Sequence, residues 1–159
     1  MSLVIRPSIN WHAAIYAGIA AGIIATAVQI ILWWACWDVL PGILYRDARL
    51  AAAIVMGSGV LPPPATFDWA VMSVATLIHV ALSMVYSIIL VRFISRCGML
   101  VAVLVGVWYG LVMFGVNMYG FTLLFPWFAE ARDWITLVAH AVFGGSCAGV
   151  YKALHPRRE

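Results

Sequence analysis

Two histidines lie inside long apolar stretches of this chain, and they are its clearest candidates for chemistry. His79 falls in the run from Asp68 to Arg92, and His140 falls in the run that follows Asp133. An imidazole in such a segment can bridge two helices by a hydrogen bond, ligate a metal, contact a small ligand or carry a proton. The hydrogen bond is the simplest explanation, and the sequence leaves the other three open.

A polar stripe surrounds His79. Ser73, Thr76, Ser83 and Ser87 recur with His79 at steps of three and four residues, so on a helix all five share one face. Lipid cannot hydrogen-bond a polar face, so we expect this one to turn toward other helices or a cavity. The stretch around His79 is therefore predicted to be the centre on which the other helices pack.

The composition assigns the chain to a class before any motif is considered. Of the 159 residues, 65% are hydrophobic and only 9% are charged, with a mean hydropathy of +1.03. A soluble domain carries roughly 25% charged residues. The apolar runs are continuous rather than alternating, which predicts an α-helical integral membrane protein. The basic residues are scattered, which argues against a nucleic-acid surface, and three cysteines without a CxxC pair indicate neither a disulfide framework nor a zinc site.

Four apolar runs predict an all-α, polytopic membrane protein: a four-helix transmembrane bundle in a single domain. The loop between the first two spans, residues 35–67, contains an amphipathic helix from Ile43 to Met56 that ends at Gly57. We expect this helix to lie in the membrane interface or to cap the bundle. The predicted spans are roughly residues 12–34, 69–92, 99–120 and 133–152.

The distribution of basic residues predicts the orientation. One side of the membrane holds both termini and the turn between the second and third spans, with Arg6, Arg92, Arg96, Lys152, Arg157 and Arg158. The opposite side holds Arg46, Arg49 and Arg132 together with most of the acidic residues. Positive residues favour the cytoplasmic side, so both termini are predicted to be cytoplasmic and the loop 35–67 to be outside.

Each predicted span contributes a polar group to the outer half of the membrane. At about 1.5 Å per helical residue, His140 lies about 9 Å inside Trp134 and His79 about 15 Å inside Trp69. Gln29 and Asn117 lie near the outer ends of the first and third spans. We predict a polar cluster here, and besides the two histidines it comprises Gln29, Thr76, Ser83, Asn117 and Thr136.

Small residues form a second stripe along the first span. Gly18 and Gly22, followed by Thr26 and Gln29, allow another helix to approach closely. That helix can belong to the same bundle, or it can belong to a second copy or a membrane-protein partner.

Three specific chemistries compete for the two histidines. His79 and His140 could ligate haem b from opposite faces, although a depth difference of about 6 Å counts against this. They could instead contact a quinone or another small ligand, or line a path for protons or a small solute. Apart from Arg92, Asp133 and Lys152 at their ends, the spans contain no Asp, Glu, Lys or Arg, which argues against transport. Hydrolytic motifs such as GxSxG and HExxH are absent, so an enzyme is not indicated.

Several segments resemble the YagU-type family of small bacterial inner-membrane proteins. The segments are Leu77–Ser83 with Tyr86, Gly106–Val112, Pro126–Glu130 and Ala139–Gly144. The resemblance covers the chain from about residue 70 onward, and the first span and its loop match only in outline. It implies a multi-pass protein of the bacterial inner membrane with a histidine in corresponding helices, and it implies no activity.

The sequence thus leads to a non-enzymatic function as the first hypothesis. We expect an accessory or interaction subunit that contacts the lipid bilayer and forms a homo-oligomer or binds a membrane-protein partner. The first alternative is an electron-transfer subunit that binds haem b or quinone through His79 and His140. The second alternative is a transporter of protons or a small solute.

Overall fold

The computed structural model describes residues 9–37 and 39–155, and these residues form helices and short connections without a β-strand. Three arginines of the orientation prediction, Arg6, Arg157 and Arg158, lie outside the described residues. The helices are α1 (Trp11–Cys36), α2 (Gly42–Met56), α3 (Trp69–Ile94), α4 (Met99–Gly115) and α5 (Trp134–Leu154). A π-helical turn, Val116–Gly120, and a 3-10 turn, Phe121–Leu123, extend α4, and the 3-10 segment η4 (Pro126–Ala131) leads to α5.

Four of these helices are long and apolar enough to cross a membrane: Trp11–Cys36, Trp69–Ile94, Met99–Leu123 and Trp134–Leu154. Their outward faces carry large exposed apolar side chains, among them Ile23 on α1, Leu77 on α3 and Trp108 on α4. Such a surface is unfavourable in water and favourable in lipid, because lipid cannot compete for polar contacts and solvates apolar groups. The chain is an all-α, multi-pass membrane bundle, as the sequence predicts.

Short polar side chains start three of the four long helices. Asn10 accepts a hydrogen bond from the Ala13 amide, and Asp68 accepts from the amides of Ala70 and Val71. Asp133 accepts from the Thr136 amide. The first amides of a helix have no partner within it, so these caps satisfy groups that would be costly to leave unpaired near lipid.

Glycines bring α4 and α5 into backbone contact. A Cβ atom at Gly106 would clash with the backbone of Gly144, and one at Gly110 would clash with the carbonyl of His140. A Cβ atom at Gly144 would in turn clash with the carbonyl of Gly106. The two helices therefore pack at a separation that only glycine permits along this contact, as small residues do in many membrane helix pairs.

The glycine stripe of α1 is also used inside the bundle. A Cβ atom at Gly18 would lie 2.6 Å from the carbonyl oxygen of Ser83 and 2.8 Å from Cβ of Ser87, both on α3. At this crossing the buried Ser87 hydroxyl donates to the carbonyl of Ala14 at 2.6 Å. The stripe is thus occupied by a helix of the same chain.

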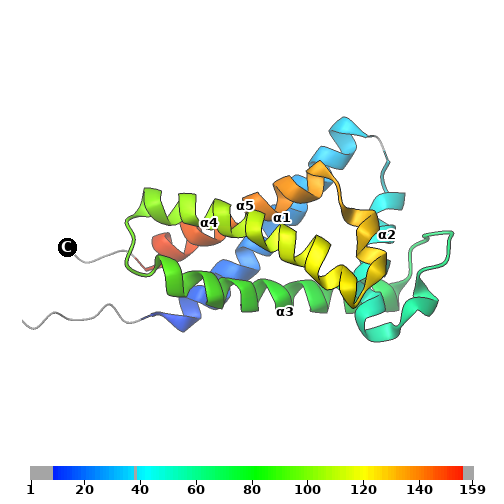
Figure 1. The fold of residues 1–159 in the computed structure, drawn as a ribbon, viewed down its shortest axis with the longest axis horizontal. Coiled ribbons are helices and arrows are strands. Elements are labelled where there is room, and N and C mark those ends of the chain that lie inside the picture. Colours follow the sequence, from blue (N-terminus) through cyan, green and yellow to red (C-terminus); the bar gives the residue numbers. More distant parts are fainter. Residues whose placement is uncertain (1–8, 38, 156–159) are drawn as a thin grey trace, which may run out of the picture.

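Beyond the crossing, α1 and α3 separate. Figure 1 shows α1 and α5 running together toward one corner of the molecule while α3 and the end of α4 run toward another. The cyan helix α2 lies at the wide end, between the ends of α1 and α3. The amphipathic helix therefore covers the wide end of the bundle, which is one of its two predicted positions.

Polar contacts hold α2 in this position. The Arg49 guanidinium donates to the carbonyls of Val60 and Thr66 in the segment that follows α2. The indole of Trp127 in η4 donates to the carbonyl of Leu50 at 3.0 Å. The helix ends at Gly57, whose φ of +82° is strained for any residue with a side chain.

Candidate functional site

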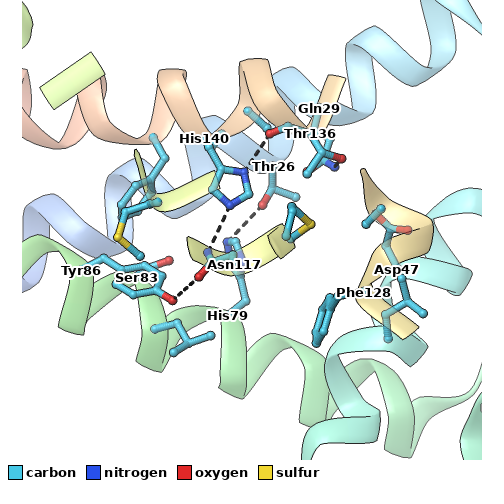
Figure 2. A pocket seen from close by; sticks show the side chains of 18 residues that line it. Thr26, Gln29, Asp47, His79, Ser83, Tyr86, Asn117, Phe128, Thr136 and His140 are labelled. Carbon is cyan, nitrogen blue, oxygen red and sulfur yellow. Dashed lines mark hydrogen bonds between the residues drawn. The ribbon is translucent and has the colours of Figure 1, made fainter. Parts of the chain in front are cut away.

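A cavity of about 240 Å³ lies at the wide end of the bundle, and we refer to it as the chamber. Residues from α1, α2, α3, α5, η4 and the end of α4 surround it. Figure 2 shows the side chains that line it. Its polar lining consists of Thr26, Gln29, Asp47, His79, Ser83, Tyr86, Asn117, Thr136 and His140.

His140 is held by hydrogen bonds at both ring nitrogens. Its Nδ1 lies 2.8 Å from the carbonyl oxygen of Thr136, which can only accept, so Nδ1 carries a hydrogen. Its Nε2 lies 3.2 Å from Nδ2 of Asn117, which can only donate, so Nε2 presents a lone pair. The contacts therefore define one neutral tautomer of His140, and Phe114 supports the ring edge-on at 5.6 Å between centroids.

A tyrosine on α3 fixes the orientation of Asn117. The hydroxyl of Tyr86 donates to Oδ1 of Asn117 at 2.8 Å, which leaves the amide nitrogen to face His140. Tyr109 on α4 donates to the carbonyl of Tyr86 at 3.0 Å. A continuous chain of donors thus joins α3, the π-helical turn and α5, and it consumes the hydrogen-bonding capacity of His140.

His79 is held less completely. Its Nε2 lies 3.2 Å from the hydroxyl of Thr26 and 3.4 Å from the carbonyl of Gly22, both on α1. A carbonyl can only accept, so the contact with Gly22 places the hydrogen on Nε2 and a lone pair on Nδ1, whereas donation from Thr26 would place the lone pair on Nε2. In either tautomer Nδ1 has no partner among the described residues. The side chain is exposed within the isolated chain and lines the cavities beside it. His79 is therefore the histidine whose ring keeps one nitrogen, Nδ1, available to a ligand.

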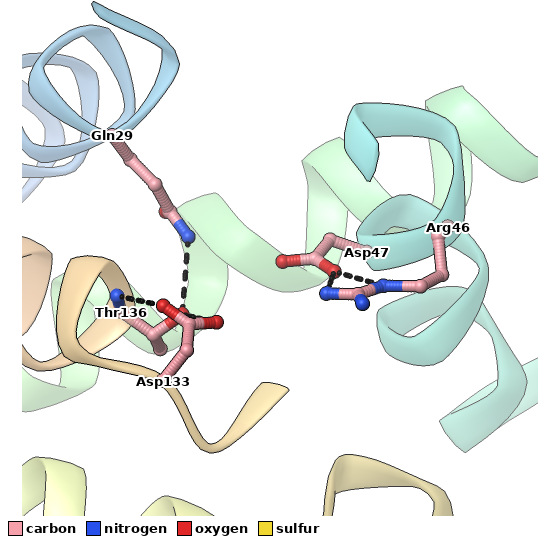
Figure 3. Close-up of polar contacts among 5 residues, drawn as sticks. All are labelled: Gln29, Arg46, Asp47, Asp133 and Thr136. Carbon is pink, nitrogen blue, oxygen red and sulfur yellow. Dashed lines mark hydrogen bonds and ion pairs between the residues drawn. The ribbon is translucent and has the colours of Figure 1, made fainter. Parts of the chain in front are cut away.

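On the α1 side of the chamber, Gln29 meets Thr136. The Thr136 hydroxyl donates its single hydrogen to Asp133 at 3.1 Å, so its oxygen accepts from the Gln29 amide nitrogen at 3.5 Å. The carbonyl oxygen of Gln29 is then left without a donor among the described residues. Figure 3 shows Gln29 and Asp47 extending from different helices, and both side chains line the chamber.

Asp47 brings a carboxylate from α2 to the chamber. Arg46 donates to one carboxylate oxygen through Nε at 2.9 Å and through Nη2 at 2.7 Å. The other oxygen points away from Arg46, toward the side where Gln29 lies (Figure 3). Burial raises the pKa of Asp47 above its ordinary value, Arg46 opposes this, and the nearby Asp133 and Glu130 add to it.

An apolar groove of about 490 Å³ adjoins the chamber between α1, α2 and α3. Its walls are mostly aliphatic, and Trp33, whose indole N–H has no acceptor among the described residues, also lines it. The groove and the chamber share five polar residues: Thr26, Gln29, Asp47, His79 and Ser83. The two hollows therefore meet along a common polar wall.

The structure gathers most of the predicted polar cluster in one place. Gln29, Ser83, Asn117 and Thr136 line the chamber together with both histidines. Thr76 lines only the groove, where its hydroxyl donates to the carbonyl of Met72 in its own helix. All four long helices thus contribute to one polar region.

The arrangement does not fit ligation of haem by two histidines. Both nitrogens of His140 are occupied, and iron could bind Nε2 only if the bond to Asn117 were broken. The nitrogen of His79 that is free is the one on the opposite side of the ring from its α1 contacts. In the described part of the chain, no group of three His, Cys, Asp or Glu side chains could hold a metal ion.

Sequence reasoning missed three residues of the chamber. Tyr86 lies seven residues after His79 and three after Ser83, so the helical period alone could have placed it on the same face. Asp47 lies four residues after Ile43 and three before Leu50, on the apolar face of α2. A charge in the middle of an apolar face was the signal that could have identified it. Thr26 was expected to serve helix packing, and it contacts His79 instead.

Comparison of the chain with protein-family models, with curated proteins and with solved structures gives no match. The chemistry of the chamber and the groove is therefore the basis on which a function is proposed.

Proposed function

We propose that this protein binds an amphipathic small molecule, with its polar head in the chamber and a single apolar chain in the groove. The observation that carries the proposal is the polar wall shared by the two hollows, in which His79 retains an unpaired nitrogen. An unpaired polar group in the membrane is costly, and a ligand that pairs with it is correspondingly favoured.

The sizes of the hollows agree with this division. Typical small-molecule sites measure roughly 300–1,000 Å³, and the chamber at about 240 Å³ falls below that range. The groove at about 490 Å³ falls within it. The chamber fits a head group, and the aliphatic groove between the transmembrane helices α1 and α3 fits a chain that enters from the lipid.

The glycine stripe was the first argument for a partner subunit, and the structure gives this stripe another role. The glycines of α1 that suggested a partner helix face α3 of the same chain, and those of α4 face α5. We retain the bacterial inner membrane and cytoplasmic termini as part of the proposal. Arg92 and Lys152 support this orientation, because they lie at the ends of α3 and α5 away from the chamber, and Arg96 lies in the turn that follows α3.

The test is saturable binding of radiolabelled dodecan-1-ol to the protein in phosphatidylcholine nanodiscs, with empty nanodiscs subtracted. Ala51 lines the groove on α2, and Ala51→Phe should fill part of it and weaken binding about 10-fold or more, a loss of about 1.4 kcal/mol. Val55, on the same helix, is 71% exposed and lines neither hollow, so Val55→Phe should bind like the wild type. Absence of saturable binding to the wild type would overturn the proposal.

A further inference from the structure

The hydrogen-bonding capacity that remains in the chamber indicates what a head group must offer. Three groups that can only accept have no donor among the described residues: Nδ1 of His79 in the tautomer that bonds to Gly22, the amide oxygen of Gln29 and the second carboxylate oxygen of Asp47. The donors that remain are neutral: the second N–H groups of the Gln29 and Asn117 amides, the indole N–H of Trp33 in the groove, and the Ser83 hydroxyl, which can also accept. The chamber therefore favours a head group that carries hydrogen-bond donors.

The charge in the lining of the chamber is negative. Among the residues that line the chamber and the groove, Asp47 is the one with a formal charge. Arg46 contacts a single oxygen of that carboxylate, while Glu130 and Asp133 also act on it from nearby. The one charged side chain in the lining is therefore acidic, which favours a cationic head group and disfavours an anionic one.

Burial leaves the Asp47 carboxylate incompletely solvated. Its side chain is 21% exposed, and burial is the strongest influence on its pKa, which it raises. A cation at the free oxygen would replace the missing water and favour the ionised form. An ammonium group has three N–H donors, one for each of the three chamber groups that can only accept.

We infer that the amphipathic ligand carries a protonated primary amine, bound by Asp47, Gln29 and His79, while its chain lies in the groove. This inference rests on the proposed function and names the class of its ligand. A fatty-acid head would meet the Asp47 carboxylate with the same charge. A quinone head offers only carbonyl acceptors, which cannot pair with the unpaired acceptors of the chamber.

The test compares chains of matched length with different heads: dodecylamine, dodecan-1-ol, dodecanoate and decylubiquinone, in phosphatidylcholine nanodiscs near neutral pH. Dodecylamine should bind the wild type at least about 10-fold more tightly than each of the others. Asp47→Asn keeps the shape of the side chain and should remove this advantage, and its thermal unfolding in mild detergent, matched to that of the wild type, shows that the variant is folded. Glu130→Gln, a neutralised acid that lines neither hollow, should keep the preference for the amine.

Each other outcome has a definite meaning. If the wild type binds the alcohol or the quinone as tightly as the amine, the amine inference is wrong and the proposed function stands. If Asp47→Asn keeps the preference for the amine, Asp47 does not select the head group and the inference is again wrong. If no probe binds saturably, the proposed function itself fails.

Discussion

Two pairs of helices in this bundle pack in different ways. α4 and α5 stay in backbone contact through Gly106, Gly110 and Gly144, which face one another over more than one helical turn. α1 and α3 meet at Gly18 and Gly22 and then separate where Thr26 on α1 contacts His79 on α3, because these side chains are too large for backbone contact. The difference shows that glycine spacing decides where a membrane bundle is closed. Where the glycines end, side chains fill the interface and a chamber can form.

The largest expected effect comes from a substitution in the backbone contact between α4 and α5. Gly110→Ala places a Cβ against the carbonyl of His140, and neither backbone can move without separating α4 from α5. We expect a loss of about 3 kcal/mol or no folded protein, measured by thermal unfolding in mild detergent. Gly115→Ala, on the same helix with nothing within 4 Å of its Cβ, should be neutral or stabilise by up to about 1 kcal/mol. Equal stabilities for the two variants would contradict the backbone contact.

The two histidines should differ in what they contribute to stability. His140→Ala leaves the partly buried Asn117 amide without its acceptor and should cost about 1–2 kcal/mol. His79→Ala removes weaker contacts at an exposed side chain and should cost less than about 0.6 kcal/mol. Both variants should bind the amphipathic probe less tightly if the chamber holds its head. A larger loss of stability for His79→Ala than for His140→Ala would reverse the comparison.

A smaller effect is expected at the crossing of α1 and α3. Ser87→Ala removes the buried hydrogen bond to the Ala14 carbonyl and the acceptor of the Cys147 thiol, and should cost about 0.6 kcal/mol. Ser146→Ala is the matched control, since its hydroxyl bonds only to carbonyls of its own helix. Thermal unfolding of both variants should separate them. If both are as stable as the wild type, the glycine contact alone holds the crossing.

The smallest effect concerns pH at the chamber. The pKa of Asp47 is raised in the folded protein above its ordinary value of 3.8, so between the two values the folded state holds more protons than the unfolded state. Stability should therefore fall as the pH rises through that window, and Asp47→Asn should remove this component. Unfolding temperatures of both proteins from pH 4 to pH 8 test it. A steeper dependence in Asp47→Asn than in the wild type would contradict the sign.

Amphiphile binding should follow the opposite trend with pH. An ammonium head pairs with ionised Asp47, so its affinity should rise as the pH passes through the pKa of this carboxyl. The affinity of the uncharged alcohol should change little over the same range. These two titrations separate the charge of Asp47 from any general change in the bundle.

The sequence by itself determined the class of the protein and the place of its long helices. Continuous apolar runs must be helices if they cross lipid, because only a helix satisfies its own backbone there. Asp68 and Asp133 mark helix starts for a local reason, since a side chain caps the amides that follow it directly. The period of three and four residues likewise gathered His79 and Ser83 on one face, and both line the chamber, whereas Ser73 and Thr76 on the same predicted face are exposed.

Only the tertiary structure decided which polar groups are satisfied and which remain available. Nothing in the spacing distinguishes His140 from His79, because the bond from Asn117 depends on a contact between segments far apart in the chain. Asp47 reaches the chamber because α2 folds back over the wide end of the bundle. From the sequence, this helix could cap the bundle or lie in the membrane interface. Helical periodicity fixes the face of a residue, whereas the partner across that face follows from how the helices cross.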